Sequence, residues 1–331
     1  MKNSNNNIGG KEVVIGLNAA IVTVSENTPA VLTVDNIEGV KDGREGLPFG
    51  AFDPKQHRTM ELGLRSLVRE QAGLLLGHVE QLYTFGDRAR QDTSRAQEGR
   101  HVVSIGYLAV TRPAEMSNRW RDWYGFFPWE DWRKERPPIL DEALLPALSE
   151  WVKQEARAGK TETRSRQGLT PGDRLRLYFG LGEIPWDEER VLERYELLYQ
   201  AGLVREAVLD GRGQGEPPGW SGIAMCYDHR RILATAMSRL RGKLKYRPVV
   251  FESMPDEFTL YELQKTVEAI LGHRLHKQNF RRLVDKGGLV EDTGKKNARM
   301  GGRPAALVRF RREVLYERPS PGLRLRPSRR G

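Results

Sequence analysis

Residues 259–310 decide the fold of the C-terminal part of the chain, and they read TLYELQKTVEAILGHRLHKQNFRRLVDKGGLVEDTGKKNARMGGRPAALVRF. Thr259 and Glu262 have the T-x-x-E spacing of a capping box, in which each side chain binds a free amide at the start of a helix. The helix that follows has apolar residues on one face and ends at Gly272. A second amphipathic helix is predicted over residues 276–286.

A hairpin is predicted after the second helix. A short strand over residues 289–292 leads into a basic turn, residues 293–304, and a second strand covers residues 305–310. Helix, tight turn, helix and a hairpin with a basic tip is the element order of a winged helix-turn-helix domain. We expect this domain to span residues 248–315.

The charge of this region favours nucleic acid as its partner. Residues 273–312 contain twelve Lys or Arg against three acids, a local net charge of +9, and the whole chain has a formal net charge of +10. Arg and Lys pair with guanine and phosphate, and Asn and Gln pair with adenine. The predicted DNA contacts are Lys277, Gln278, Asn279, Arg281 and Arg282 on the second helix, and Lys295, Lys296, Arg299 and Arg303 on the hairpin. Two alternatives remain: a winged helix that contacts protein or acts as a spacer, and a basic segment that is only a solvated face.

The N-terminal part has a different pattern. Residues 11–36 alternate apolar and polar side chains around a polar turn, which predicts a β-hairpin. A helix is predicted over residues 59–71 and is stopped by Gly73, and two strands follow over residues 78–85 and 101–110. This order predicts an α+β fold, an α/β/α layered domain rather than a doubly wound sheet.

Residues 112–222 are less regular and contain all seven tryptophans. Helices are predicted over residues 141–157 and 187–202. We interpret this region as a helical, Trp-rich insertion that folds onto the first domain, with a possible role in dimerisation. A further helix over residues 229–244 is predicted to be capped by Asp228.

Several segments of the chain resemble one protein family. Residues 62–87 (LGLRSLVREQAGLLLGHVEQLYTFGD) resemble a decayed Nudix box with the strand that follows it. Residues 226–264, 279–294 and 301–305 continue the resemblance to Nudix-related transcriptional regulators, and the C-terminal block is its most specific part. That family joins a Nudix domain to a winged helix and regulates genes of NAD metabolism in bacteria. The long Trp-rich insertion is most similar to the NadQ-type regulators of NAD biosynthesis in alphaproteobacteria.

The residues at the Nudix-box positions argue against hydrolysis. An active box reads G-x5-E-x7-R-E-U-x-E-E-x-G-U, with U aliphatic, and its glutamates hold Mg²⁺ against a pyrophosphate. With Gly73 on the last glycine of the box, the acidic positions fall on Arg58, Leu67, Glu70 and Gln71. Only Glu70 is acidic, so we expect no catalytic residues and no metal site. The alternatives are a helix unrelated to Nudix, or a weak hydrolase that uses Glu61 or Glu80 as substitute ligands.

The resemblance implies that the first domain, residues 11–247 with the insertion at about 112–222, is a sensor with a ligand pocket. An adenine nucleotide is the expected effector: NAD, or alternatively ATP or ADP-ribose. The predicted ligand-binding residues are Arg65, Glu70, Tyr83, Arg112, Trp123 and Trp129, the tryptophans as stacking partners for adenine. Core packing is the competing interpretation of these tryptophans.

Composition limits the remaining classes of protein to which the chain could belong. The chain has 331 residues, one cysteine, Cys226, and no apolar run long enough for a membrane helix, so we expect a cytoplasmic protein without disulfides. Residues 1–10 are expected to be disordered, and so are residues 319–331 of the basic tail, which spans residues 316–331. The resemblance to the Nudix-related regulators, joined to the predicted winged helix, implies a dimeric, ligand-responsive repressor of NAD biosynthesis genes that binds double-stranded operator DNA. The alternative is a Nudix pyrophosphatase that acts on ADP-ribose or NAD.

Overall fold

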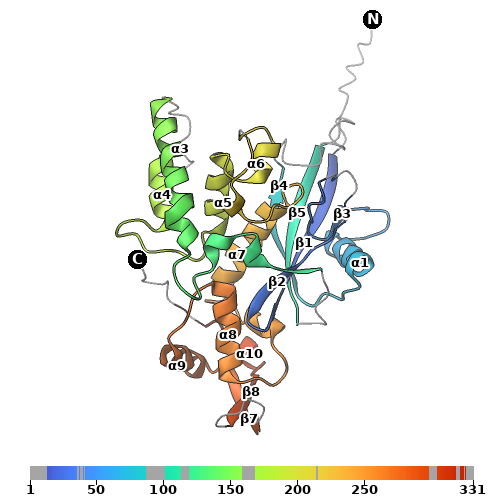
Figure 1. Cartoon of the computed structure of the whole chain (residues 1–331). Coiled ribbons are helices and arrows are strands. Elements are labelled where there is room, and N and C mark those ends of the chain that lie inside the picture. Colours follow the sequence, from blue (N-terminus) through green and yellow to red (C-terminus); the bar gives the residue numbers. More distant parts are fainter. Residues whose placement is uncertain are drawn as a thin grey trace, which may run out of the picture.

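The structure is a computed structural model that describes residues 13–35, 37, 40, 42–86, 101–112, 119–158, 168–213, 215–297, 304–317, 321–323 and 325. The described residues place a mixed six-stranded sheet at the centre of the molecule (Figure 1). Its strands are β1 (Val13–Ser25), β2 (Thr28–Leu32), β3 (Phe49–Ala51), β4 (Val79–Phe85), β5 (His101–Val110) and β6 (Trp120–Asp122). They are ordered β4-β5-β1-β2-β6, and β3 pairs with β1.

The predicted N-terminal hairpin is present. β1 and β2 are antiparallel, and they are joined at Glu26 and Asn27, whose φ angles of 48° and 63° lie in the left-handed region. β1 also runs parallel to β5, from the Val13–His101 pair to the Val22–Val110 pair. The polar turn residues thus allow the chain to reverse between β1 and β2. Because successive side chains of β1 point to opposite faces of the sheet, β1 contributes buried side chains to both faces.

Helices cover both faces of the sheet, as expected for an α/β/α sandwich (Figure 1). α1 (Met60–Ala72) buries Leu64 and Val68 against one face, with Ile105 and Tyr107 of β5 in the same cluster. α7 (His229–Lys243) covers the opposite face, where its Ile232 lies against Gly106 of β5. Because side chains alternate between the two faces along β5, neighbouring residues of this strand contact different helices, one α1 and the next α7.

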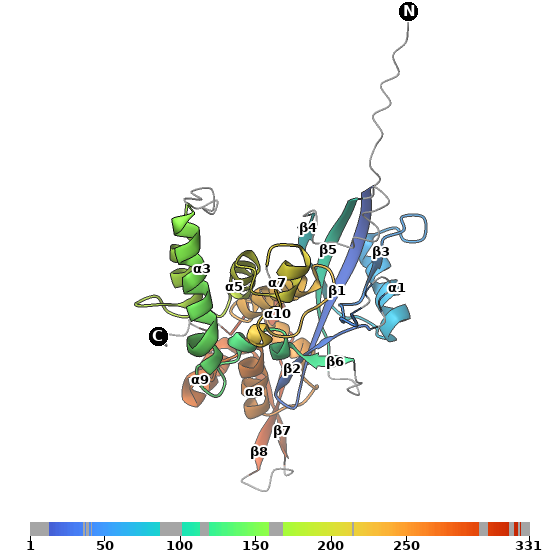
Figure 2. The same ribbon diagram turned by 45° about the horizontal axis from the view of Figure 1, so that its top comes forward.

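The Trp-rich region forms helices beyond α7. They are α3 (Leu145–Arg157), preceded by a π-helical turn (Leu140–Leu144), α4 (Pro171–Phe179), α5 (Val191–Gln200) and α6 (Arg205–Leu209). In both views α5 lies between α7 and the pair α3 and α4, on the side of the molecule away from α1 (Figure 1; Figure 2). The helices predicted over residues 141–157 and 187–202 are present as α3 with its π-helical turn and as α5, and α5 is shorter than expected. The prediction missed that β6 of this region pairs with β2 and so completes the central sheet.

The C-terminal elements have the order of a winged helix. They are α8 (Leu260–Leu271), α9 (Lys277–Gly287), β7 (Val290–Asn297), β8 (Ala305–Phe310) and the short α10 (Val314–Glu317). Thr259 and Glu262 form the predicted capping box, and Gly272 ends α8 with a φ of 79°. β7 is longer than expected, and the β7–β8 hairpin projects away from the central sheet (Figure 2).

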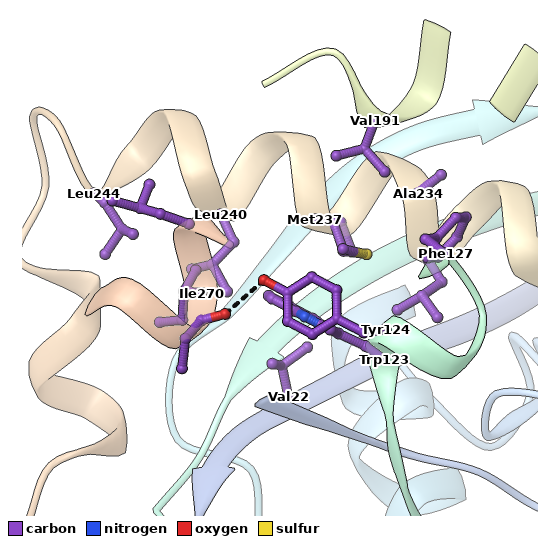
Figure 3. Packing of buried hydrophobic residues seen from close by; sticks show 14 of the residues in the cluster. Val22, Trp123, Tyr124, Phe127, Val191, Ala234, Met237, Leu240, Leu244 and Ile270 are labelled. Carbon is purple, nitrogen blue, oxygen red and sulfur yellow. Dashed lines mark hydrogen bonds between the residues drawn. The ribbon is translucent and has the colours of Figure 1, made fainter. Parts of the chain in front are cut away.

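α8 shares its core with the first domain. Leu263, Val267 and Ile270 belong to the same buried cluster as Met237 and Leu240 of α7. Figure 3 shows Tyr124 between α7 and the end of α8, where its hydroxyl donates to the Ala269 carbonyl at 2.7 Å. The winged helix is therefore packed against the first domain rather than attached by a free linker.

A buried charge network reinforces this junction. The Glu130 carboxylate accepts from Arg194 at 2.6 Å and from Arg241 at 2.7 Å, and all three side chains are fully buried. Arg241 also donates to the Ile270 carbonyl at 2.9 Å, which connects α7 to α8. Buried charges need such mutual partners because their desolvation is costly.

Two local expectations are corrected. Asp228 takes the N-cap position of α7, but its side chain does not cap the helix; it pairs with Arg231 at 3.2 Å.

In the C-terminal tail, Leu323 is 2% exposed, and its amide donates to the Leu244 carbonyl at 3.0 Å. The described part of the tail thus packs on the end of α7 and is not the free segment that its basic composition predicts.

Within the described residues, no helix combines the length and the apolar character that crossing a bilayer requires.

Candidate functional site

α9 presents the predicted DNA-contacting face. Phe280 and Val284 are buried, because they lie four residues apart on the side of the helix that meets the core. The opposite side is exposed, and it includes Lys277, Gln278, Asn279, Arg281 and Arg282, followed by Asp285. All five predicted helix residues therefore lie on the solvent side of one short helix.

The polar side chains of this face make few contacts with the residues that the structure describes. Arg282 approaches the Asn279 side-chain oxygen at 3.5 Å, the limit of a hydrogen bond. Arg274, just before α9, and Lys286, in its last turn, are also exposed, and the sequence prediction omitted both. The local charge count already included these two cations and could have identified them.

The wing contributes a second set of cations. Lys295 and Lys296 of β7 are exposed, and the Lys295 ammonium pairs with Glu257 at 2.7 Å. Gly294 has a φ of 74°, so the strand bends just before them. Arg299 and Arg303, the other predicted wing residues, lie outside the described residues.

α1 has its polar groups engaged close to the helix. Arg65 pairs with Glu61 at 2.8 Å and donates to the carbonyl oxygens of Leu76 and Gly77. Glu70 accepts from the Ser66 hydroxyl at 2.8 Å. These contacts tie the helix to itself and to the loop that follows it.

The residues at the Nudix-box positions do not fit a magnesium ion. Leu67 and Gln71 stand at two of the acidic positions, and the Gln71 amide binds the backbone of Phe49 instead. Across the described ranges, no group of three or more His, Cys, Asp or Glu side chains is arranged to hold a metal ion. Mg²⁺ takes oxygen ligands that include carboxylates, and one exposed carboxylate does not make such a site.

The predicted ligand residues do not converge on one site. The Tyr83 ring lies 5.4 Å from that of Phe85, and Phe85 lies beneath Arg231 of α7. Tyr83 is thus on the α7 face of the sheet, whereas Arg65 and Glu70 are on α1 at the opposite face. The structure therefore does not bring these three side chains together, because β4 is irregular between Gln81 and Thr84 and the Tyr83 ring lies on the α7 side with Phe85.

Trp123 and Trp129 are core residues. Both side chains are 0% exposed, and both belong to the large cluster around α7, where Figure 3 shows Trp123 beside Tyr124 and Val22. A nucleotide could stack on either ring only if the core opened. The prediction that they stack on adenine is therefore wrong, and core packing explains them.

Arg112 lies at the junction between the first domain and the winged helix. It follows β5, and its guanidinium pairs with Asp256 at 2.6 Å, just ahead of α8. Both residues line a cavity of about 1000 Å³. Neither this cavity nor a second one of about 570 Å³ has a lining residue from α1. The junction therefore offers a space for a ligand that the Nudix-box prediction did not identify.

Comparisons with known proteins agree with this architecture. Residues 250–310 match the family model of the NrtR DNA-binding winged helix domain. A stretch of 88 residues is 43% identical to the ADPR responsive transcriptional repressor NtrR of Acinetobacter baylyi. That match covers 27% of this chain and 35% of the relative, so the chain spans about a third of the length of this relative.

Two solved structures resemble the chain over most of its length. One is Shewanella oneidensis NrtR complexed with a 27mer DNA, with a TM-score of 0.51 and 19% identity over 91% of this chain and 95% of that one. The other is a MutT/nudix family protein from Enterococcus faecalis, with a TM-score of 0.50 and 14% identity over 91% and 88%. The chain thus has an α+β, Nudix-like fold followed by a C-terminal winged helix.

Proposed function

We propose that this chain is a ligand-responsive transcriptional repressor that binds operator DNA through α9 and the wing. The observation that carries the proposal is the exposed face of α9, whose cations and amides lie on a domain that matches the NrtR DNA-binding winged helix. A helix of this kind fits the major groove, where base edges are distinguishable. The DNA contacts are Lys277, Gln278, Asn279, Arg281 and Arg282, with Lys295, Lys296, Arg299 and Arg303 at the wing.

The effector is an adenine nucleotide. The name of the Acinetobacter relative, an ADPR responsive repressor, puts ADP-ribose first, ahead of NAD and ATP. The target genes are those of NAD biosynthesis, which rests on the resemblance of the Trp-rich insertion to NadQ-type regulators. An effector regulates only when it binds one conformation of the protein more tightly than the other.

The sensor acts without hydrolysis. Leu67 and Gln71 at the acidic positions of the Nudix box leave Glu70 without the carboxylate partners that Mg²⁺ needs. The repressor also acts as a homodimer, since winged-helix and helix-turn-helix regulators commonly bind paired half-sites. Light scattering of the purified protein tests the dimer.

A gel-shift titration at fixed salt tests the main proposal. The probes are DNA upstream of the chain's own gene and of neighbouring NAD biosynthesis genes, and scrambled DNA serves as the control. A specific shift that changes on addition of ADP-ribose, NAD or ATP is expected. Absence of a specific shift contradicts the repressor, and Mg²⁺-dependent release of nucleoside monophosphate above background favours the pyrophosphatase alternative.

A further inference from the structure

The C-terminal end of α8 is held by donors from outside the winged helix. The last carbonyl oxygens of a helix have no partner within it and must find one elsewhere. The Ala269 carbonyl accepts from the Tyr124 hydroxyl at 2.7 Å (Figure 3). The Ile270 carbonyl accepts from Nε of Arg241 at 2.9 Å. Because Tyr124 belongs to the Trp-rich insertion and Arg241 to α7, the first domain supplies the hydrogen bonds that complete this end of α8.

The Trp-rich insertion also lies directly on the turn between α8 and α9. The Trp132 amide donates to the Gly272 carbonyl at 2.6 Å, and Trp132 and His273 form an isolated parallel bridge. The two segments approach so closely that a β-carbon on Gly272 would collide with the Glu130 carbonyl oxygen. We call Tyr124, Glu130 and Trp132 the turn clamp.

The turn clamp is itself held firmly. The Glu130 carboxylate binds Arg241 at 2.7 Å and Arg194 at 2.6 Å in the buried charge network. The Trp132 ring packs against that of Trp186, with the centroids 4.5 Å apart. Buried charge-assisted hydrogen bonds have a defined geometry and are costly to break. The turn clamp therefore holds the turn in one place.

The far end of the turn connects this fixed point to α9. The Leu275 amide donates to the Glu268 carboxylate at 2.9 Å, and the Leu275 carbonyl accepts from Gln264 at 3.0 Å. The next residue, His276, is the N-cap of α9, and among the described residues no side chain caps that end of the helix. The buried apolar side of α9 gives attraction without direction. The backbone of the turn therefore sets where the polar face of α9 points.

We propose that the turn clamp positions α9 for reading the base sequence, which gives the Trp-rich insertion a part in DNA specificity. This inference rests on the proposed function, in which α9 binds operator DNA. Paired hydrogen bonds to base edges need a narrow geometry, whereas attraction to phosphates depends mainly on charge. Loss of the turn clamp thus lowers the affinity for operator DNA more than the affinity for unrelated DNA.

Tyr124→Phe tests the turn clamp, because it removes one hydroxyl and keeps the ring. In gel shifts of the full chain at fixed salt, we expect operator affinity to fall about three- to tenfold, with the affinity for scrambled DNA unchanged. The matched control is Tyr199→Phe on α5. Tyr199 is also buried, and its hydroxyl donates to Asp210 at 2.5 Å within the insertion itself. This control loses a comparable hydrogen bond, yet the ratio of operator to scrambled affinity should not change.

A second pair of variants isolates the backbone contact at Trp132. Trp132→Ala removes the ring and keeps the amide, whereas Trp132→Pro removes the ring and the amide donor to Gly272. Asp131, the residue before it, already has the extended backbone that precedes a proline, with φ −94° and ψ 93°. We expect the ratio of operator to scrambled affinity to fall further in Trp132→Pro than in Trp132→Ala. Equal ratios would show that the amide contact does not position α9.

The outcomes separate this inference from the proposed function. If Tyr124→Phe keeps the affinity ratio of the unmodified chain, or lowers both affinities equally, the turn clamp does not position α9 and the inference is overturned. An unmodified chain that shifts operator and scrambled DNA alike contradicts the proposed function instead. Hydrogen exchange still tests the turn clamp in that case, since Tyr124→Phe should accelerate exchange of the α9 amides and Tyr199→Phe should not. Unchanged exchange in α9 overturns the turn clamp as well.

Discussion

α1 and α9 are both short amphipathic helices that end at a glycine in the left-handed region, Gly73 with a φ of 68° and Gly288 with a φ of 54°. They differ in what happens to their polar side chains. On α1, Arg65 binds Glu61 and two backbone carbonyl oxygens, and Glu70 accepts from Ser66. Most of the polar groups of α1 that have a partner thus bind the helix itself or the loop after it, and Gln71 binds the backbone of β3.

On α9, the polar groups face solvent with few internal partners. Arg281 has no hydrogen bond or ion pair to any described residue, and Arg282 has only the long contact to Asn279. A helix that keeps its cations unpaired stabilises the fold only through its apolar side, here Phe280 and Val284. The comparison indicates that α1 now serves the structure, whereas α9 is available to a partner.

Double substitution of Arg281→Ala and Arg282→Ala should have the largest effect on DNA binding. We expect a loss of about 3 kcal/mol or more in operator affinity, because each base or phosphate contact contributes about 1–3 kcal/mol. The melting temperature should stay unchanged, since both side chains are exposed. Gel shifts and thermal melts measure the two effects, with Arg69→Ala on α1 as the matched control. Unchanged affinity would move the reading face away from α9.

Gly272→Ala tests the turn that leads into α9. A β-carbon there would lie 2.4 Å from the Glu130 carbonyl oxygen, and the φ of 79° disfavours any residue with a side chain. We expect a loss of about 2–4 kcal/mol in the free energy of unfolding, together with weaker DNA binding. Chemical denaturation checks the first and a gel shift the second. A variant as stable as the original chain would show that the α8–α9 turn is not tightly packed.

Gly73→Ala is the matched substitution at the end of α1. Its φ is similar, but nothing lies within 4 Å of the added carbon. The cost should therefore be only the conformational one, about 1 kcal/mol in the free energy of unfolding. Operator affinity should not change. A loss of DNA binding here would contradict the view that α1 is structural.

Arg65→Ala should have the smallest effect. Its ion pair with Glu61 is partly exposed, and such pairs within a helix contribute about 0.3–0.5 kcal/mol. The lost bonds to two loop carbonyl oxygens raise the expected cost to about 1 kcal/mol at most. Denaturant melts give the stability and calorimetry gives the nucleotide affinity. A large loss of ADP-ribose binding with normal stability would assign α1 a role in sensing after all.

The sequence predicted best where the signal is local. The capping box of Thr259 and Glu262, the stop at Gly272 and the amphipathic pattern of α9 all lie within a few residues of the groups they bind. The β1–β2 hairpin was predicted for the same reason, because its turn residues adjoin the strands they join. The failed cap at Asp228 shows the limit, since its backbone has a φ of −91° and a ψ of 15° rather than the extended conformation of an N-cap, and its carboxylate pairs with Arg231 instead.

By itself, then, the sequence determined the β1–β2 hairpin, most of the longer helices, the winged-helix order and the cations of α9, but not β6, α4 or α6. Only the tertiary structure decided which side chains share a site. Trp123 and Trp129 lie in the core, and Tyr83 and Arg65 lie on opposite faces of the sheet. Arg112 pairs with Asp256, which is 144 positions further along the chain. The physical reason is that hydrogen bonds at helix ends reach only three or four residues. The faces of a sheet and the walls of a cavity are instead assembled from segments whose packing no local pattern records.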